Sequence, residues 1–183
     1  CRLEHKSALQ WRMDTHRVRT RATRPTGPSR RPKVARLIES EHDIRAGVRA
    51  LRRKCEFMRR IHDTTGDPPL RRQPAGFAGL ARVIVGQQLS VASAAAIWGR
   101  TQALCAPFEP AGLMALGDAQ LVAAGLSRAK IRTLRAIGAA CANGLDLDRL
   151  GAATEDEVHA ALTEIVGVMP WTADVYIMFC LGR

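Results

Sequence analysis

The sequence has 183 residues, of which 46% are hydrophobic, 4% aromatic and 25% charged, and its formal net charge is +11. No run of eighteen apolar residues occurs, which excludes a membrane-spanning helix, and we expect a soluble protein. A chain of this length is long enough to bury a single compact core.

The positive charge is concentrated in the first 36 residues, which hold eleven Lys or Arg and two acids. Residues 37–183 hold seventeen basic and fifteen acidic residues, so the basic balance says little about this part. The first 36 residues contain few apolar side chains, and such a segment cannot offset the entropy lost on ordering. We therefore expect residues 1–36 to be a disordered basic tail. It is either a DNA-binding arm or a leader that is not native to the protein.

The cysteine pattern argues against a metal centre. Five cysteines are present, at positions 1, 55, 105, 141 and 180. None forms a Cys-x-x-Cys pair and no His stands at ligand spacing beside one, so we expect no metal and no cofactor. Scattered cysteines in apolar contexts are typical of reduced core residues in a cytosolic protein. No apolar segment follows the early charges, so we expect no signal peptide and a cytoplasmic location.

Every periodic segment of the chain has helical spacing, and none alternates as a strand would. The sequence therefore predicts an all-α fold. The first expected helix opens at a Ser40–Asp43 capping box and runs through Leu51. Trp98 is expected in the core. The further helices are expected over residues 55–62, 77–88, 90–104, 112–116, 118–125, 127–143, 145–150 and 154–166, and from 170 onward.

Residues 162–174 predict two helices joined by a very short turn. Thr154 and Glu157 form a capping box that opens the first of these helices. Gly167 suits the left-handed residue that ends a helix, and Pro170 suits the first turn of the next. The apolar face of the first helix is expected to consist of Val158, Leu162, Ile165 and Val166. Free amides at such a turn can bind a nucleic-acid phosphate, although an ordinary αα-hairpin explains the same pattern.

Two other segments contain polar residues between apolar helices. Gly86–Ala92 holds the consecutive amides Gln87 and Gln88, whose polar atoms must be satisfied where they are buried, for example by the backbone of the turn. Gly125–Lys130 begins a helix that Ser127 caps. The basic residues of that helix are expected to face mostly outward, as a solvated face or as phosphate contacts: Arg128, Lys130, Arg132 and Arg135.

These three segments, in this order, resemble motifs of the helix-hairpin-helix DNA glycosylases. Gly167–Asp174 is similar to the hairpin Gly-Ile-Gly-Pro-Trp-Thr-Ala-Asp of the DNA-3-methyladenine glycosylase II branch. Gly86–Ala92 is similar to its Gly-Gln-Gln-x-Ser-x-x-Ala motif, and Gly125–Lys130 to Gly-Leu-Ser-x-x-Lys. The resemblance covers roughly residues 37–183, which we predict to be one helical glycosylase domain. Met169 departs from the second hairpin glycine; if that position needs a positive φ or a close phosphate, Met costs roughly 1–2 kcal/mol.

The resemblance implies a base-excision repair enzyme that everts an alkylated purine of the 3-methyladenine type from double-stranded DNA and hydrolyses its N-glycosidic bond. It implies a base pocket of Gln87, Gln88 and Trp171. It also implies DNA-backbone contacts by Gly167, Val168, Met169, Thr172 and Lys130. Related lyase-capable glycosylases carry a Schiff-base Lys where this chain has Trp171, so a monofunctional enzyme is expected. We also expect the protein to be a monomer.

The catalytic carboxylate of the resembled branch is not expected within this chain. Asp174 is the one acid just after the hairpin, but in that branch the catalytic Asp follows the next helix, which here contains Tyr176. We therefore read the chain as a member incomplete at its C-terminus, with the catalytic Asp beyond Arg183 and no activity by itself. The alternatives are a non-catalytic DNA-binding helix-hairpin-helix module, or a degenerate helical protein without a nucleic-acid role, which Met169 would permit.

Overall fold

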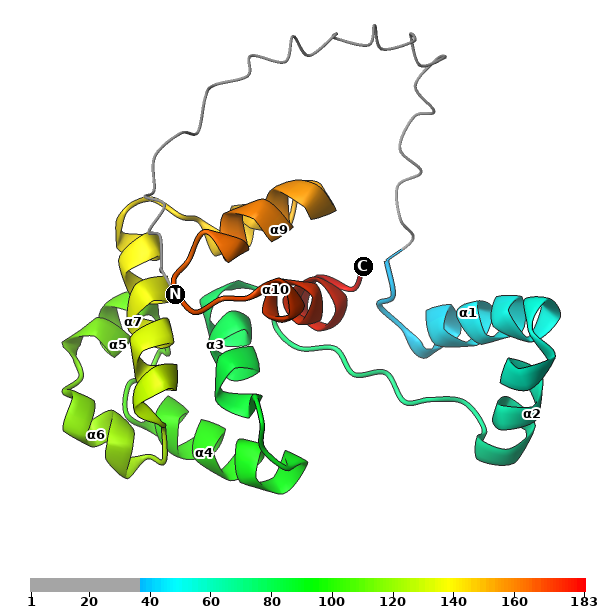
Figure 1. Ribbon diagram of the computed structural model, residues 1–183, viewed down its shortest axis with the longest axis horizontal. Coiled ribbons are helices and arrows are strands. Elements are labelled where there is room, and N and C mark those ends of the chain that lie inside the picture. The colour runs from blue at the N-terminus through cyan, green and yellow to red at the C-terminus, as the bar shows by residue number, and fades with distance from the viewer. Residues whose placement is uncertain (1–36) are drawn as a thin grey trace, which may run out of the picture. The chain divides into compact units, whose positions relative to one another are not determined.

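The computed structural model describes residues 37–183, and the predictions for residues 1–36 lie outside this part. Within it the chain forms ten α-helices and a terminal π-helical segment and no strand, which confirms the all-α prediction (Figure 1). None of the helices in this range is long and apolar enough to cross a membrane. The elements are α1 (Glu41–Lys54), α2 (Glu56–Thr65), α3 (Gly76–Gly86), α4 (Val91–Ala103), α5 (Pro110–Ala115), α6 (Asp118–Ala123), α7 (Arg128–Ala142), α8 (Leu147–Leu150), α9 (Glu155–Thr163), α10 (Pro170–Tyr176) and η1 (Ile177–Leu181).

Helix α3 packs against more of the described elements than any other element does. It contacts α4, α7, α8, α10 and η1. Its sequence carries one charged residue, Arg82, and its buried side chains include Leu80, Ile84 and Val85. A Cβ at Gly79 would lie 2.0 Å from the Pro74 carbonyl oxygen, so glycine allows the preceding connector to pass close to this helix.

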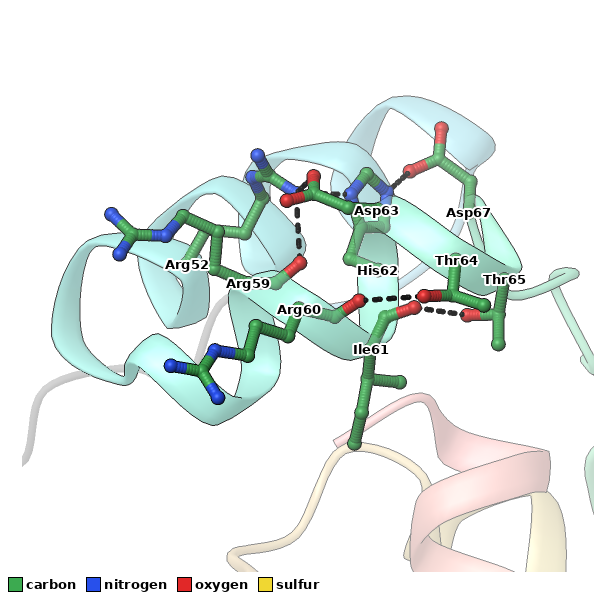
Figure 2. A network of polar contacts seen from close by, with 9 residues as sticks. All are labelled: Arg52, Arg59, Arg60, Ile61, His62, Asp63, Thr64, Thr65 and Asp67. Carbon is green, nitrogen blue, oxygen red and sulfur yellow. Dashed lines mark hydrogen bonds and ion pairs between the residues drawn. The ribbon is translucent and has the colours of Figure 1, made fainter.

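Helices α1 and α2 form a hairpin joined by polar contacts, and neither helix contains a buried residue (Figure 2). Arg52 Nη1 donates to Asp63 Oδ1 at 2.5 Å and to His62 Nδ1 at 2.8 Å. A guanidinium can only donate, so Nδ1 of His62 accepts and its Nε2–H donates to Asp67 Oδ1, 2.8 Å away. One neutral tautomer of His62 therefore satisfies both contacts.

The capping residues Ser40, Ser127 and Thr154 are confirmed, whereas the expected cap Asp118 is the first residue of α6 and follows its N-cap Gly117. Several helix ends also differ by two or three residues from those expected. Capping boxes open α1 at Ser40 and α9 at Thr154. Helix α9 ends at Thr163, and Val166 is 79% exposed, so its assignment to the apolar face is wrong. The cause is a tightened turn, in which the Ile165 N–H bonds three residues back, to the Leu162 carbonyl, and the chain leaves the helix.

The remaining core predictions are confirmed in part. Trp98 is 8% exposed and makes an edge contact with the ring of Phe108, at a centroid distance of 5.1 Å. Of the cysteines described, Cys180 is buried and the other three are half-buried. All four are free thiols.

Tyr176 ties the last helices to the start of α3. Its side chain is fully buried, and its hydroxyl oxygen accepts a hydrogen bond of 2.9 Å from the Gly76 N–H. Burial raises the pKa of Tyr176 to about 12, from an ordinary value of 10.0, although the bond from Gly76 acts in the opposite direction. The phenol therefore stays protonated in the folded chain where it would ionise in the unfolded one.

We predict that Tyr176→Phe lowers the free energy of unfolding by about 1–2 kcal/mol at neutral pH, because the buried Gly76 N–H loses its acceptor. In the wild type, the stability linked to Tyr176 is fully present below pH 10 and is lost as the pH rises towards 12. Urea unfolding from pH 8 to 12 measures both effects. In the variant the loss above pH 10 becomes shallower, whereas the loss linked to Cys180, whose pKa burial raises to about 11, remains. An unchanged alkaline profile would contradict this assignment.

Candidate functional site

The connection between α3 and α4 contains the two consecutive amides. Helix α3 ends at Gly86, two residues earlier than predicted, because Gln88 has a φ of +56° and cannot continue a right-handed helix. Ser90 then opens α4 by accepting a hydrogen bond from the Ser93 N–H. A non-glycine residue in the left-handed region is uncommon and is frequently found at functional sites.

Gln87 joins this bend to α10, the second helix of the hairpin that α9 and α10 form. Its Nε2 donates to Thr172 Oγ1 at 2.8 Å, and Thr172 is 2% exposed. The expectation that the backbone of the turn satisfies the amides is not met at Nε2 of Gln87, whose partner is a side chain of α10. The contact fixes the position of the bend relative to the hairpin.

Lys130 supports the same bend from α7. Its Nζ donates to the carbonyl oxygen of Val85 at 2.7 Å and to that of Gln87 at 2.9 Å. These carbonyls lie at the C-terminal end of α3, where a helix lacks internal donors and favours a cation. Burial lowers the pKa of Lys130. The expectation that Lys130 faces outward is therefore wrong, and its contact with a DNA backbone stays a prediction that rests on the one N–H left free.

Arg135 also differs from the expected solvated face. It pairs with Asp118 at 2.8 Å and donates to the carbonyl oxygen of Leu113 at 2.7 Å. Arg128 and Arg132 are exposed, as expected. Two of the four basic residues of α7, Lys130 and Arg135, therefore bind other parts of the fold, and the other two face solvent.

The hairpin between α9 and α10 packs against α7. Gly167 has a φ of +88°, and a Cβ there would lie 2.2 Å from Thr133 Oγ1, so both the conformation and the space require glycine. Met169 has a φ of −88° and is 65% exposed, so this residue carries no left-handed strain. Of the residues predicted to contact DNA, Gly167 and Met169 lie at the surface. The side chains of Val168 and Thr172 face the interior.

Gln87, Gln88 and Trp171 line one hollow of about 500 Å³. Trp171 lies at the edge of the hollow and is 63% exposed. The wall is largely apolar and includes side chains of α3, α4, α10 and η1. The residues that sequence reasoning missed here are Arg71, Gln73, Arg82, Val83, Leu89, Val91, Ala94, Ala95, Val175 and Phe179. Arg82 could have been noticed as the single charge of an apolar helix, whereas no local pattern marks Arg71.

Asp174 lies outside this hollow. Its carboxylate is 63% exposed, and Oδ1 is 3.7 Å from Nε2 of His159. Among the described residues that line the hollow, none is Asp or Glu. The hollow can therefore hold a flat apolar group between an indole and amides, but it presents no carboxylate of its own.

Comparison with solved structures identifies this arrangement. The chain is similar to a DNA-3-methyladenine glycosidase of Bacillus halodurans, with 32% identity over 79% of this chain and 65% of that one, at a TM-score of 0.61. The chain belongs to the helix-hairpin-helix DNA glycosylase superfamily. It is also similar to a 3-methyladenine DNA glycosylase of Schizosaccharomyces pombe in complex with abasic DNA, at 25% identity over 69% of this chain and 65% of that one, with a TM-score of 0.63.

A third structure shares the glycosylase fold. The 3-methyladenine DNA-glycosylase of Archaeoglobus fulgidus is 21% identical over 76% of this chain and 51% of that one, with a TM-score of 0.60. No protein-family model and no curated protein matches the chain. The chain spans less than two thirds of the length of each of these three glycosylases.

We predict that Gly167→Ala lowers the free energy of unfolding by at least about 2 kcal/mol, from left-handed strain and the clash with Thr133. The matched control is Gly99→Ala in α4, where nothing lies within 4 Å of the new Cβ and φ is helical. That control should stabilise the chain by about 0.5–1 kcal/mol. Urea unfolding compares them; equal effects would contradict the close contact.

We predict that Lys130→Met costs about 2 kcal/mol, because two carbonyl oxygens lose a charged donor. Arg132→Met removes a neighbouring exposed charge of the same helix and should stay within about 0.5 kcal/mol of the wild type. Thermal and urea unfolding measure the difference. If both variants were equally stable, Lys130 would not hold the bend.

Proposed function

We propose that the chain forms the base pocket and DNA grip of a base-excision glycosylase that hydrolyses the N-glycosidic bond of alkylated purines of the 3-methyladenine type. The observation that carries this proposal is the shared hollow of Gln87 and Trp171 beside the glycine hairpin. Its partner is double-stranded DNA with an alkylated base, bound by a monomer in the cytoplasm, where the nucleoid lies.

Eversion of one nucleotide is the step that requires a hollow. A stacked nucleotide hides its C1′ atom, and extruding it costs a few kcal/mol, which is least for a damaged base. The indole of Trp171 is exposed enough to stack on an everted purine. An alkylated purine carries positive charge, and an aromatic face attracts a cation by about 0.5–2 kcal/mol. Gln87 keeps its carbonyl oxygen for the base, because its amide nitrogen is bound to Thr172.

The hairpin supplies the grip on the backbone. Among residues 37–183, the N–H groups of Gly167 and Met169 have no hydrogen-bond acceptor. Unpaired amides at a turn before a helix bind a phosphate without reading sequence. Because Met169 adopts an extended φ, its side chain can turn towards solvent and leave the amides accessible.

Cleavage needs a carboxylate that stabilises the oxocarbenium-like sugar and positions water. No described residue in the hollow supplies one, so the 183-residue chain should bind an everted nucleotide without releasing a base. The enzyme is monofunctional, because Trp171 cannot form the imine that a Lys at this position would form. Asp174 has no part in the chemistry, since its carboxylate does not line the hollow.

The direct test compares the binding of a duplex containing an abasic-site analogue with that of the same undamaged duplex. The wild-type chain should prefer both the abasic duplex and a duplex with one mispaired purine at least tenfold. Trp171→Ala should abolish most of the preference for the mispaired purine, whose base stacks on the indole. The control Asp174→Asn should leave it unchanged. Base release from methylated duplex DNA by the 183-residue chain, if lost in Asp174→Asn, would show that the wrong carboxylate was set aside.

A second candidate is a non-catalytic DNA-binding module. The absence of a carboxylate among the described residues of the hollow favours it. Such a module would bind both duplexes equally, with a steep salt dependence from phosphate contacts alone. The same titrations, repeated between 50 and 200 mM salt, separate the two candidates.

A further inference from the structure

Two arginines that the motifs do not include face the hollow from different elements. Arg82 comes from α3, and Arg71 from the connector between α2 and α3. The connector is held in place, because the Gln73 N–H donates to the Phe179 carbonyl oxygen at 2.9 Å. The backbone that carries the two arginines therefore belongs to a fixed part of the site.

Neither arginine is used by the described fold. Within residues 37–183, no hydrogen bond or ion pair joins the side chain of Arg71 or Arg82 to another residue, and both are exposed. Arg52 and Arg135, in contrast, are each paired with an aspartate. The described lining of the hollow contains no acid, so it carries two positive charges that the chain leaves unneutralised.

The remaining wall defines what else the ligand must be. Val83, Val175 and Phe179 are apolar, and Trp171 stands at the edge. A cationic purine alone would be repelled by two guanidinium groups. A ligand that fits both features has a flat apolar body and carries anionic groups close to it. A nucleotide with its flanking phosphates has this chemistry, and guanidinium binds phosphate oxygens in a bidentate manner.

We propose that Arg71 and Arg82 bind the phosphates that flank a nucleotide everted into the hollow. The inference rests on the proposed function and adds two binding residues to it. The contact forms only when a nucleotide leaves the duplex and brings its phosphates to the rim. The two arginines thus strengthen binding to damaged DNA selectively. The phosphates that they bind neutralise the positive charge that would otherwise repel a cationic base.

The experiment uses the 183-residue chain and two labelled duplexes, one with an abasic-site analogue and one undamaged, in anisotropy titrations at several salt concentrations. Arg71→Gln and Arg82→Gln should each weaken binding to the abasic duplex about tenfold. Each should also reduce its salt slope by about 0.9, the value for one phosphate. Binding to the undamaged duplex should change less than twofold. The matched control is Arg149→Gln, an exposed arginine of α8 that does not line the hollow.

The outcomes separate this inference from the proposed function. If the wild type prefers the abasic duplex but both rim variants behave like Arg149→Gln, the phosphate contact is wrong and the glycosylase proposal stands. If the wild type shows no preference, both are overturned. Deoxyadenosine monophosphate serves as the competitor for a free-nucleotide source. If it displaces the abasic duplex at micromolar concentration in an Arg82-dependent manner, the site binds mononucleotides and the assignment to DNA phosphates is overturned.

Discussion

The hydrogen bond from Gln87 to Thr172 is the contact on which the arrangement of the site depends. It joins side chains 85 residues apart in the sequence, one at the end of α3 and one in α10. Lys130 adds a second restraint by binding the carbonyl oxygens of Val85 and Gln87 from α7. Three segments that are distant in sequence are thereby held at one point. Because interiors are closely packed, a shift of this point would move Trp171 relative to the amides and change the shape of the hollow.

Two left-handed residues, one on each side of this point, give the site its sharp changes of direction. Gly167 meets the requirement with the residue type that adopts a positive φ without cost, and the contact with Thr133 leaves room for no other. Gln88 adopts a positive φ although it has a side chain, which costs about 1 kcal/mol. The surrounding contacts must hold it in this conformation. The left-handed conformation of Gln88 explains why the side chains of Gln87 and Gln88 line the hollow and do not continue helix α3. That of Gly167 explains why the hairpin can bring its amides close to another surface.

Local patterns predicted the helices and the capping residues at Ser40, Ser127 and Thr154, because these depend on neighbours in the sequence. That Gln87 and Trp171 share a pocket was implied by the family resemblance and not by any local pattern. The capping boxes at Ser40 and Thr154 follow from side chains three residues apart, and Gly167 from the need for a left-handed turn. What could not be predicted depends on long-range packing. Lys130 looked like a surface cation because nothing in its own helix shows the two carbonyl oxygens of α3. Val166 looked buried because its spacing continued a helix that a tightened turn ends. The rim arginine of the connector has no motif at all, and only the folded chain brings Arg71 beside the hollow.

The claim that this hollow receives an everted nucleotide is tested most directly by 2-aminopurine fluorescence in a duplex where the probe is mispaired and therefore easy to extrude. On addition of the chain, the emission should rise as the probe leaves the base stack. It should rise less with Trp171→Ala, because the everted probe loses the indole on which it stacks. An emission that stays at the value of the free duplex with both proteins, under conditions where anisotropy reports binding, would contradict the account.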